Sequence, residues 1–426
     1  MKNIILSVAL FFSSFVAQSQ DIEYARSIID TLCSLSMHGR GYVNYGDKIA
    51  AKFIKNEFKK LELKSFKDSY EQFFFININT FPYKTTVKID DKELIPAKDF
   101  FVGCGSNKIS GTYSLTWLDK SIINKKGKFK KFLKSDLTNK FIVIDKSGVT
   151  DEVALMLLSA LHYQNFVRAK GIITLHDSNM VWTVSDGSKV SNYTYLDCYR
   201  NCISPESQKI TLDISNRFVK NYETQNVIGY IEGKLEADSF IIFSAHYDHL
   251  GRMGADIYFP GANDNASGTA MIIDLARHYS KPENQPDYSI AFIAYSAEEA
   301  GLFGSTYFAD NSFIPLKKIK FVLNLDMVGT GSKGIKVVNG EILKKEFETI
   351  KKTNELKSYV KEVSARGESP NSDHYPLYSK AVPAFFIYTA GREHLEYHTI
   401  NDKAEDLPLT EYEDLFKLLL DFVKTF

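Results

Sequence analysis

The chain has 426 residues, a length that predicts more than one structural unit, and 44% of them are hydrophobic, which is enough for a large buried core. Lys plus Arg and Asp plus Glu each number 52, so the formal net charge is zero. No net field therefore favours nucleic acid or an anionic membrane as a partner of the whole chain.

The first twenty residues have the pattern of a secretory signal peptide. Lys2 supplies a positive start, residues 4–16 are mostly apolar, and Ala17-Gln18-Ser19 is typical of a small-residue cleavage site. We expect residues 1–20 to be removed and the mature protein to be secreted or periplasmic. No later stretch is long and apolar enough to predict a membrane span.

Residues 21–98 are expected to form the N-terminal part of the main domain. An apolar stripe at helical spacing predicts an amphipathic helix, and its members are Ile49, Ala50, Phe53, Ile54, Phe58 and Leu61. A glycine-rich turn, Met37-His38-Gly39-Arg40-Gly41, precedes this helix. The alternating segment Tyr70–Ile89 predicts strand structure that packs against the C-terminal sheet.

Residues 99–218 have a different sequence pattern from the segments on either side and are expected to form a smaller inserted domain. The segments Phe141–Asp145, Val153–Ala169 and Gly171–Leu175 predict the order strand, helix, strand. The lysine-rich run Lys125–Lys134 is interpreted as a solvated basic turn. The sequence of this region contains no cluster of candidate metal ligands, so we expect the chemistry to lie elsewhere.

Residues 219–426 place ligand-type side chains beyond the ends of four apolar runs that predict buried strands. Ile241–Phe243 leads to His246 and Asp248, Tyr288–Ala294 to Glu298 and Glu299, Phe321–Leu325 to Asp326, and Pro383–Tyr388 to His398. Because ligands bind beyond the carboxyl ends of strands in open α/β sheets, we expect these side chains to meet. The predicted fold class is α/β, with a mixed, mostly parallel central sheet flanked by helices and the smaller domain inserted.

Asp264 joins this set from a Gly/Asn-rich turn that opens the predicted helix Gly268–Tyr279. Neutral imidazoles and carboxylates are ligands that zinc binds. Taken singly, each residue has an ordinary explanation as a turn histidine, an acid in the first turn of a helix, or an N-terminal cap. Their joint occurrence favours a metalloenzyme.

Five short motifs follow one another in this half of the chain. They are H-x-D at His246, G-A-N-D-N-A-S-G around Asp264, E-E at Glu298, N-L-D-M at Asp326 and Y-H-T at His398. In type and order they resemble the co-catalytic di-zinc aminopeptidases of the bacterial leucyl aminopeptidase type, relatives of glutamate carboxypeptidases, glutaminyl cyclases and the transferrin receptor ectodomain. The strand–helix–strand order of residues 99–218 is similar to the protease-associated domain often inserted in these peptidases.

The resemblance implies a role for each residue. His246 and Asp326 would bind one zinc, Glu299 and His398 a second, and Asp264 would bridge the two ions. Glu298 would be the general base that takes a proton from the attacking water. Asp248 would be the carboxylate that fixes the tautomer of the His246 imidazole. The peptide bond after Asp264 would be cis.

Residues around these motifs leave alternatives open. Ser372-Asp373-His374 is similar to a family element, and either a pocket wall or a polar turn explains it. Many family members place a tyrosine just ahead of this element to donate to the oxyanion. None stands there in this chain, so Tyr375 and Tyr388 are the candidates. His249 and His394 are interpreted as surface residues or as supports of the ligands.

The four cysteines are too few for a disulfide framework. They are Cys33, Cys104, Cys198 and Cys202. Cys198 could pair with Cys202, either could pair with Cys104, and free buried thiols are expected equally. None lies in a C-x-x-C zinc pattern, so no metal is assigned to them.

These observations favour a secreted zinc exopeptidase with two zinc ions per chain. The expected activity is that of an aminopeptidase, a hydrolase acting on peptides or proteins with a free N-terminus. A carboxypeptidase or a glutaminyl cyclase on the same scaffold remains an alternative. A non-catalytic binding ectodomain would be expected to lack ligands, whereas this chain retains all five candidates and Glu298. The oligomeric state, the preferred side chain and the native metal are not predicted.

Overall fold

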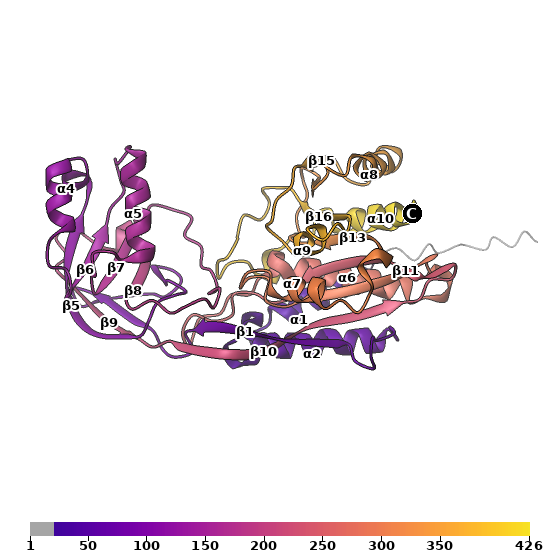
Figure 1. Ribbon diagram of the computed structural model, residues 1–426, viewed down its shortest axis with the longest axis horizontal. Coiled ribbons are helices and arrows are strands. Elements are labelled where there is room, and N and C mark those ends of the chain that lie inside the picture. Colours follow the sequence, from indigo (N-terminus) through magenta and orange to yellow (C-terminus); the bar gives the residue numbers. More distant parts are fainter. Residues whose placement is uncertain (1–20) are drawn as a thin grey trace, which may run out of the picture.

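The computed structural model describes residues 21–426, so the expected signal peptide at residues 1–20 lies outside the described residues. Within residues 21–426 the chain forms two domains, each built on an eight-stranded sheet (Figure 1). In this part of the chain, no helix combines the length and apolarity that crossing a bilayer requires.

The sheet of the larger domain has the strand order β1-β10-β12-β11-β13-β16-β14-β15. Its strands are β1 (Glu71–Thr80), β10 (Arg217–Ile231), β11 (Glu236–His246), β12 (Tyr288–Tyr295), β13 (Ile319–Leu325), β14 (Ile335–Val338), β15 (Val363–Arg366) and β16 (Ala384–Thr389). The central strands β12, β11, β13 and β16 are parallel, whereas β1, β10 and β14 join antiparallel partners. This is the mixed, mostly parallel sheet that the sequence predicts.

Helices cover both faces of this sheet. The helices on one face are α1 (Ile22–Cys33), α2 (Gly46–Lys60), α6 (Gly268–Tyr279), α8 (Lys344–Lys357) and α10 (Tyr412–Val423), and those on the other are α7 (Phe303–Asp310) and α9 (His374–Tyr378). Alternate residues of β11 point to opposite layers, because Ile241 and Phe243 pack with the first group and Ile242 with the second. The parallel strands are thus buried on both faces, which explains their continuous apolar runs.

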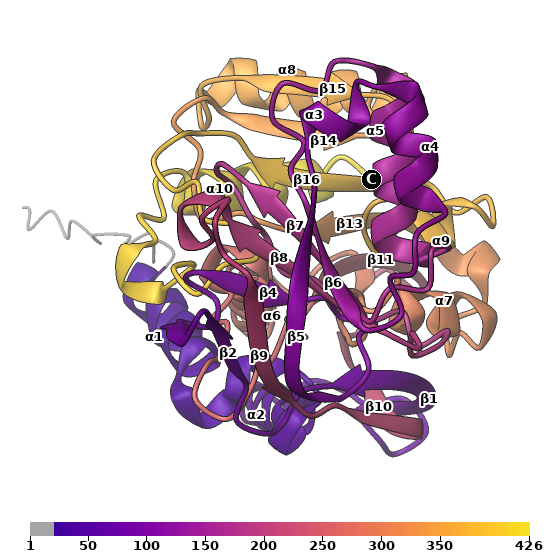
Figure 2. The same cartoon turned by 90° about the vertical axis from the view of Figure 1, so that its left-hand side faces the viewer.

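The smaller domain, hereafter the insert, is built from residues 86–214. Its sheet has the order β3-β2-β9-β5-β6-β7-β8-β4. The strands are β2 (Thr86–Ile89), β3 (Lys92–Leu94), β4 (Phe100–Val102), β5 (Ile109–Leu118), β6 (Lys140–Ile144), β7 (Gly171–His176), β8 (Thr194–Tyr199) and β9 (Lys209–Ile214). Helices α3 (Lys120–Ile123), α4 (Lys126–Leu133) and α5 (Glu152–Gln164) pack on one side of this sheet (Figure 2).

The other face of the insert packs on the main domain. Leu250, Met253 and Phe259 of the main domain belong to the same apolar cluster as Phe141 and Val143 of β6. The insert is therefore anchored beside the loop that follows β11. The four cysteines, Cys33, Cys104, Cys198 and Cys202, are all free thiols.

The insert begins earlier in the chain than the boundary at residue 99 that the sequence suggests. Strands β2 and β3 precede that boundary but belong to the second sheet, where Val87 pairs with Leu212 of β9. Of the predicted strand segment Tyr70–Ile89, only β1 joins the main sheet, through β10. Apolar alternation continues from β1 into β2 although the two strands lie in different sheets, so the pattern does not reveal the crossing.

Candidate metal centre

The strand ends that the sequence singles out meet at one edge of the main sheet. His246 is the last residue of β11, Asp326 follows β13 directly, and Glu298 and Glu299 follow β12. Their carboxyl ends lie side by side because β12, β11 and β13 are neighbouring parallel strands. His398 joins them from the loop after β16. The chain thus brings together the residues that the sequence analysis selected.

Asp264 approaches from the irregular turn Ala262–Ser267 ahead of α6. The peptide bond between Asp264 and Asn265 is cis, as the resemblance implied. The backbone N–H groups of Asn263 and Asp264 donate to the Asp402 carboxylate at 2.9 and 3.1 Å. His394 Nε2 lies 2.8 Å from Asp402 Oδ1, and its side chain is only 3% exposed. His394 is therefore a buried support of this turn, and Asp402 is a residue that sequence analysis missed.

The two carboxylate oxygens of Asp264 face two different histidines. Oδ1 lies 3.3 Å from His246 Nε2, and Oδ2 lies 3.0 Å from His398 Nε2. Asp326 Oδ1 is 3.4 Å from His246 Nε2, and Glu299 Oε2 is 3.2 Å from His398 Nε2. Donor atoms around a tetrahedral zinc with bonds of about 2.0–2.1 Å lie about 3.3 Å apart. Two donor groups that share Asp264 therefore have the spacing of two adjacent cation sites.

Asp248 is fully buried beside His246, but its carboxylate is not the closest partner of the imidazole. His246 Nδ1 lies 3.2 Å from the Asp248 carbonyl oxygen and 3.8 Å from its Oδ1. The carboxylate instead accepts from the backbone N–H of Glu298 at 3.1 Å and from the Tyr42 hydroxyl at 3.4 Å. Asp248 thus orients the imidazole mainly through its main chain, while its carboxylate positions the glutamate segment.

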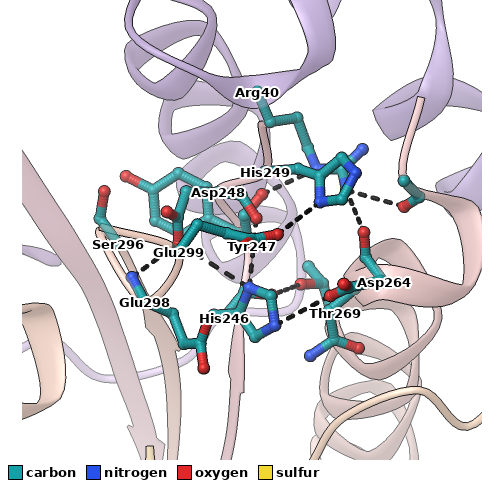
Figure 3. A network of polar contacts seen from close by, with 12 residues as sticks. Arg40, His246, Tyr247, Asp248, His249, Asp264, Thr269, Ser296, Glu298 and Glu299 are labelled. Carbon is teal, nitrogen blue, oxygen red and sulfur yellow. Dashed lines mark hydrogen bonds and ion pairs between the residues drawn. The ribbon is translucent and has the colours of Figure 1, made fainter. Parts of the chain in front are cut away.

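His249 is fully buried, so it is not a surface residue. It lies beside Glu299, which fits the alternative interpretation as a support of a ligand (Figure 3). Its Nδ1 lies 2.7 Å from Glu299 Oε1, the oxygen that does not face His398. His249, Asp264 and Glu299 also lie close enough together to hold a cation. We assign His249 to holding Glu299, because 2.7 Å is a hydrogen-bond distance and is shorter than the separation of two ligands on one tetrahedral ion.

The insert reaches the centre through its loop at residues 177–193. The Trp182 carbonyl lies 2.9 Å from His398 Nδ1, and the Trp182 backbone N–H donates to the His398 carbonyl at 3.2 Å. The indole is itself fixed, because it donates to the Val102 carbonyl and stacks on Phe259. A carbonyl only accepts, so Nδ1 carries a proton and Nε2 is left facing Asp264.

Glu298 lies beside the donor groups without belonging to either. Burial, together with the neighbouring carboxylate of Asp373, raises the pKa of Glu298 well above its usual range. Burial also raises the pKa of Asp373 to about 7. The pKa of Glu299 shifts in the opposite direction. Burial alone would raise it, but interactions with the neighbouring His398 imidazole act against burial, and the pKa of Glu299 is lowered to about 2. One glutamate is thus suited to carry a proton and its neighbour to bind a cation.

The segment Ser372-Asp373-His374 is buried behind the centre, so it is not an exposed polar turn. The Ser372 hydroxyl donates to Asp326 Oδ2 at 2.8 Å and accepts from Asn324 Nδ2 at 2.8 Å. The segment therefore fixes the orientation of a ligand-type carboxylate.

Tyr397 is the tyrosine that faces the centre, in place of the two candidates from the sequence. Its ring stacks on His398 with centroids 3.8 Å apart. Burial and the nearby site carboxylates raise the pKa of Tyr397, so its hydroxyl keeps its proton. Tyr388 instead accepts a hydrogen bond from Arg366, and Tyr375 packs beside Tyr378. The Y-H-T motif already contained this residue, directly before the histidine.

Arg40, from the glycine-rich turn near the N-terminus, is fully buried and reaches the Asp264 segment (Figure 3). Its guanidinium donates to five carbonyl oxygens: Leu32 at 3.0 Å, Tyr247 at 2.7 Å, Pro260 at 2.5 Å, Gly261 at 2.8 Å and Asp264 at 3.4 Å. Three separate segments are thereby tied together behind the two donor groups. Sequence analysis noticed the turn but assigned no role to Arg40.

Comparisons with known proteins agree with this geometry. Residues 226–423, which include every candidate residue from His246 to His398, match the model of peptidase family M28. Aminopeptidase YwaD of Bacillus subtilis (strain 168) is 39% identical over 112 residues, 26% of this chain and 23% of the relative. A glutamate carboxypeptidase 2 homolog of Caenorhabditis elegans is 29% identical over 199 residues, 45% of this chain and 24% of the relative. The sequence matches thus span about a quarter of each relative's length.

Among solved structures, the chain is similar to BSAP, a zinc aminopeptidase from Bacillus subtilis. The TM-score is 0.71 at 22% sequence identity, and the similarity covers 95% of both chains. An aminopeptidase from Aneurinibacillus sp. strain AM-1 has a TM-score of 0.66 at 21% identity, over 95% of this chain and 94% of the other. The fold is therefore shared over nearly the whole chain, insert included.

Proposed function

We propose that this chain, which belongs to peptidase family M28 through residues 226–423, is a zinc-dependent aminopeptidase that hydrolyses the N-terminal peptide bond of peptides or proteins. One observation carries the proposal: the Asp264 carboxylate faces His246 with one oxygen and His398 with the other. A buried carboxylate shared in this way between two donor groups, next to a glutamate of raised pKa, supports a two-cation hydrolase.

The residues present fit two zinc ions. His246, Asp264 and Asp326 would hold one ion, and Asp264, Glu299 and His398 the other. Each group offers one imidazole nitrogen and carboxylate oxygens at separations of 3.0–3.4 Å, which suits tetrahedral zinc with a position left for substrate or water. When bound, such a pair supplies Lewis acidity toward the scissile carbonyl and the attacking water.

Glu298 is proposed as the general base. Its carboxylate takes a proton from the attacking water and returns it to the leaving amine. A raised pKa favours this role, because it makes the Glu298 carboxylate a stronger proton acceptor than an ordinary exposed glutamate. The hydrogen bond from the Glu298 backbone to Asp248 holds this segment in place.

Tyr397 is proposed to stabilise the oxyanion that forms from the scissile carbonyl. Its hydroxyl keeps its proton and lies near the site carboxylates, so it is placed to donate to a developing negative charge. Stacking on His398 limits the positions that the ring can adopt.

A free N-terminus as the recognised group is supported by the charges near the centre. A cavity of about 660 Å³ lies beside the His398 loop, where Met180 and Val181 of the insert face Leu395 and Tyr397. Lys98, which is exposed, is the one lysine or arginine among the described residues that line it. A carboxypeptidase needs a cation for the terminal carboxylate of its substrate, whereas Glu396 offsets the charge of Lys98 in this cavity and leaves its lining without a net positive charge.

The insert is proposed to be a protease-associated domain that restricts the size of the substrate. The support for this role is that its loop contacts His398 through Trp182 and lines the same cavity. Export from the cell is also part of the proposal and rests on the leader-like sequence of residues 1–20.

A panel of chromogenic peptides tests the proposal. The purified chain should cleave aminoacyl substrates with a free amine but not their N-acetylated counterparts, and a chelator should abolish this cleavage until zinc is returned. Glu298→Gln should lose turnover by about 10²–10⁴-fold while keeping its zinc. Cleavage of N-blocked peptides from their C-terminal end would instead indicate a carboxypeptidase, and cyclisation of N-terminal glutamine a glutaminyl cyclase.

A further inference from the structure

The outward face of α5 on the insert is unusually apolar. Ala154, Leu158 and Leu161 of this helix are buried against the sheet. The side chains on the opposite face and just beyond the helix are large, apolar and exposed: Val153 is 66% exposed, Met156 72%, Leu157 40%, Tyr163 68% and Phe166 45%. A surface helix of a soluble domain normally carries polar residues on this face. Such a concentration of exposed apolar groups marks an interaction surface.

Helix α4 adds positive charge next to this apolar face. Exposed lysines stand at Lys125, Lys126, Lys128, Lys130, Lys131 and Lys134, and none of them forms an ion pair within residues 21–426. Between residues 119 and 170 there are eleven Lys or Arg against five Asp or Glu, a net charge of +6 in a chain of net charge zero. The charge of this region is therefore strongly asymmetric.

The two helices lie side by side on the same face of the insert (Figures 1 and 2). Helix α4 leads into β6 and α5 leads into β7, and these strands are parallel neighbours. The Lys170 backbone N–H before β7 donates to the Lys140 carbonyl of β6 at 3.0 Å, so the connections from both helices also meet. The exposed lysines of α4 and the exposed apolar residues of α5 therefore lie on neighbouring helices on the same side of the insert, and together they are here named the α4–α5 surface.

We propose that the α4–α5 surface binds an anionic lipid bilayer. The lysines contact the negatively charged headgroups, and Val153, Met156 and Leu157 enter the boundary between headgroups and acyl chains. The zero net charge of the chain does not oppose this, because at about 0.1 M salt charges act over a Debye length of about 10 Å. The run Lys125–Lys134, which the sequence analysis interpreted as a solvated turn, is mostly helix α4 and is then a binding element.

A bilayer suits this surface better than a second copy of the chain does. In a two-fold dimer the same surface would face itself and bring the two +6 regions together. An apolar stripe on the outer face of a helix, flanked by lysines, is the arrangement by which peripheral helices lie in a membrane interface. The surface belongs to the insert, so this proposal does not depend on the chemistry of the metal centre.

Co-sedimentation with vesicles tests the proposal. The chain without the expected signal peptide, residues 21–426, should bind phosphatidylcholine vesicles that contain phosphatidylglycerol and should bind pure phosphatidylcholine weakly. About 1 M salt, where the Debye length is about 3 Å, should release most of it. Lys128→Glu/Lys130→Glu/Lys131→Glu should weaken binding on the order of a hundredfold. Met156→Glu should weaken it about tenfold. Both variants should hydrolyse soluble substrate and melt like the unmodified chain, because these side chains are exposed.

Helix α8 of the main domain supplies matched controls. Lys344→Glu/Lys345→Glu/Lys352→Glu changes the net charge equally at exposed positions, and Leu356→Glu changes an apolar residue that is 83% exposed. Both controls should bind vesicles as the unmodified chain does. Equal binding to both vesicle types, or equal loss in the α4 and α8 triple variants, would overturn the proposal. Two other results would also overturn it, if the chain does not bind vesicles. One is self-association of the chain that Met156→Glu abolishes, and the other is binding of an acidic protein that Met156→Glu abolishes.

Discussion

Replacing Arg40 by methionine should destabilise the protein strongly, although the substitution changes none of the proposed metal ligands. Methionine has a similar length but no donors, so the five hydrogen bonds to the carbonyls of Leu32, Tyr247, Pro260, Gly261 and Asp264 are lost. Each hydrogen bond from a charged donor contributes about 1.5–3 kcal/mol. Burying the cation of Arg40 costs several kcal/mol, and the methionine variant avoids this cost, which offsets part of the lost hydrogen bonding. The net decrease in the free energy of unfolding should therefore be about 3–6 kcal/mol.

Equilibrium unfolding in urea, followed by circular dichroism on chelator-treated protein, measures this loss without a contribution from bound metal. A loss of this size is large against the usual stability of about 5–15 kcal/mol, so Arg40→Met is expected to yield little folded protein. Arg40→Lys keeps the charge and three donors and should give an intermediate loss of about 1–3 kcal/mol.

The control is Arg366→Met, at an exposed arginine that makes one hydrogen bond to Tyr388. This change should alter the stability by no more than about 0.5 kcal/mol. If Arg40→Met and Arg40→Lys unfold at the same urea concentration as the unmodified chain, the five bonds do not hold the segments together and the reasoning fails.

Three further predictions concern the surroundings of the centre. Tyr397→Phe should lower kcat about 10²–10³-fold with little change in KM, and unchanged steady-state kinetics would exclude it as the oxyanion donor. Asp402→Ala removes the acceptor of two backbone N–H groups near Asp264 and should weaken zinc binding about 10–100-fold, as read by competition with a chromogenic chelator. Burial lowers the pKa of His374 from 6.5 to about 4. The folded state thus favours the neutral ring, so its contribution is fully present above pH 6.5 and is lost as the pH falls through 4. The unmodified chain should lose up to about 3 kcal/mol more stability than His374→Phe over this range, and parallel stability curves for the two would contradict the burial argument.

The sequence was sufficient to predict the residues that meet at the strand ends. His246, Glu299 and Asp326 each follow a long apolar run, and parallel strands place their carboxyl ends at one edge. The fold class followed from the same runs, since only strands buried on both faces are continuously apolar. Asp264 and His398 were selected from the turn before the predicted helix Gly268–Tyr279 and from the loop after Pro383–Tyr388, and the resemblance added the role of each residue.

Several supporting residues were beyond prediction because they act through the main chain or over long sequence separations. Trp182 holds His398 with its carbonyl oxygen, a group that every residue possesses. Arg40 binds carbonyl groups more than 200 positions away, and Asp402 accepts from two backbone N–H groups. For His249 the sequence left a surface position and a support role open, and only the structure decides for the support role, with its imidazole 2.7 Å from Glu299. Contacts of this kind leave no pattern of residue types in the sequence.

Metal analysis of the dialysed protein tests most directly whether the two donor groups that share Asp264 would hold two cations. Atomic emission spectrometry should find two zinc ions per chain, one in His398→Ala, and fewer than two in Asp264→Asn, because the shared carboxylate serves both ions. A single zinc in the unmodified chain, or two that persist when His398 or Asp264 is replaced, would contradict the account.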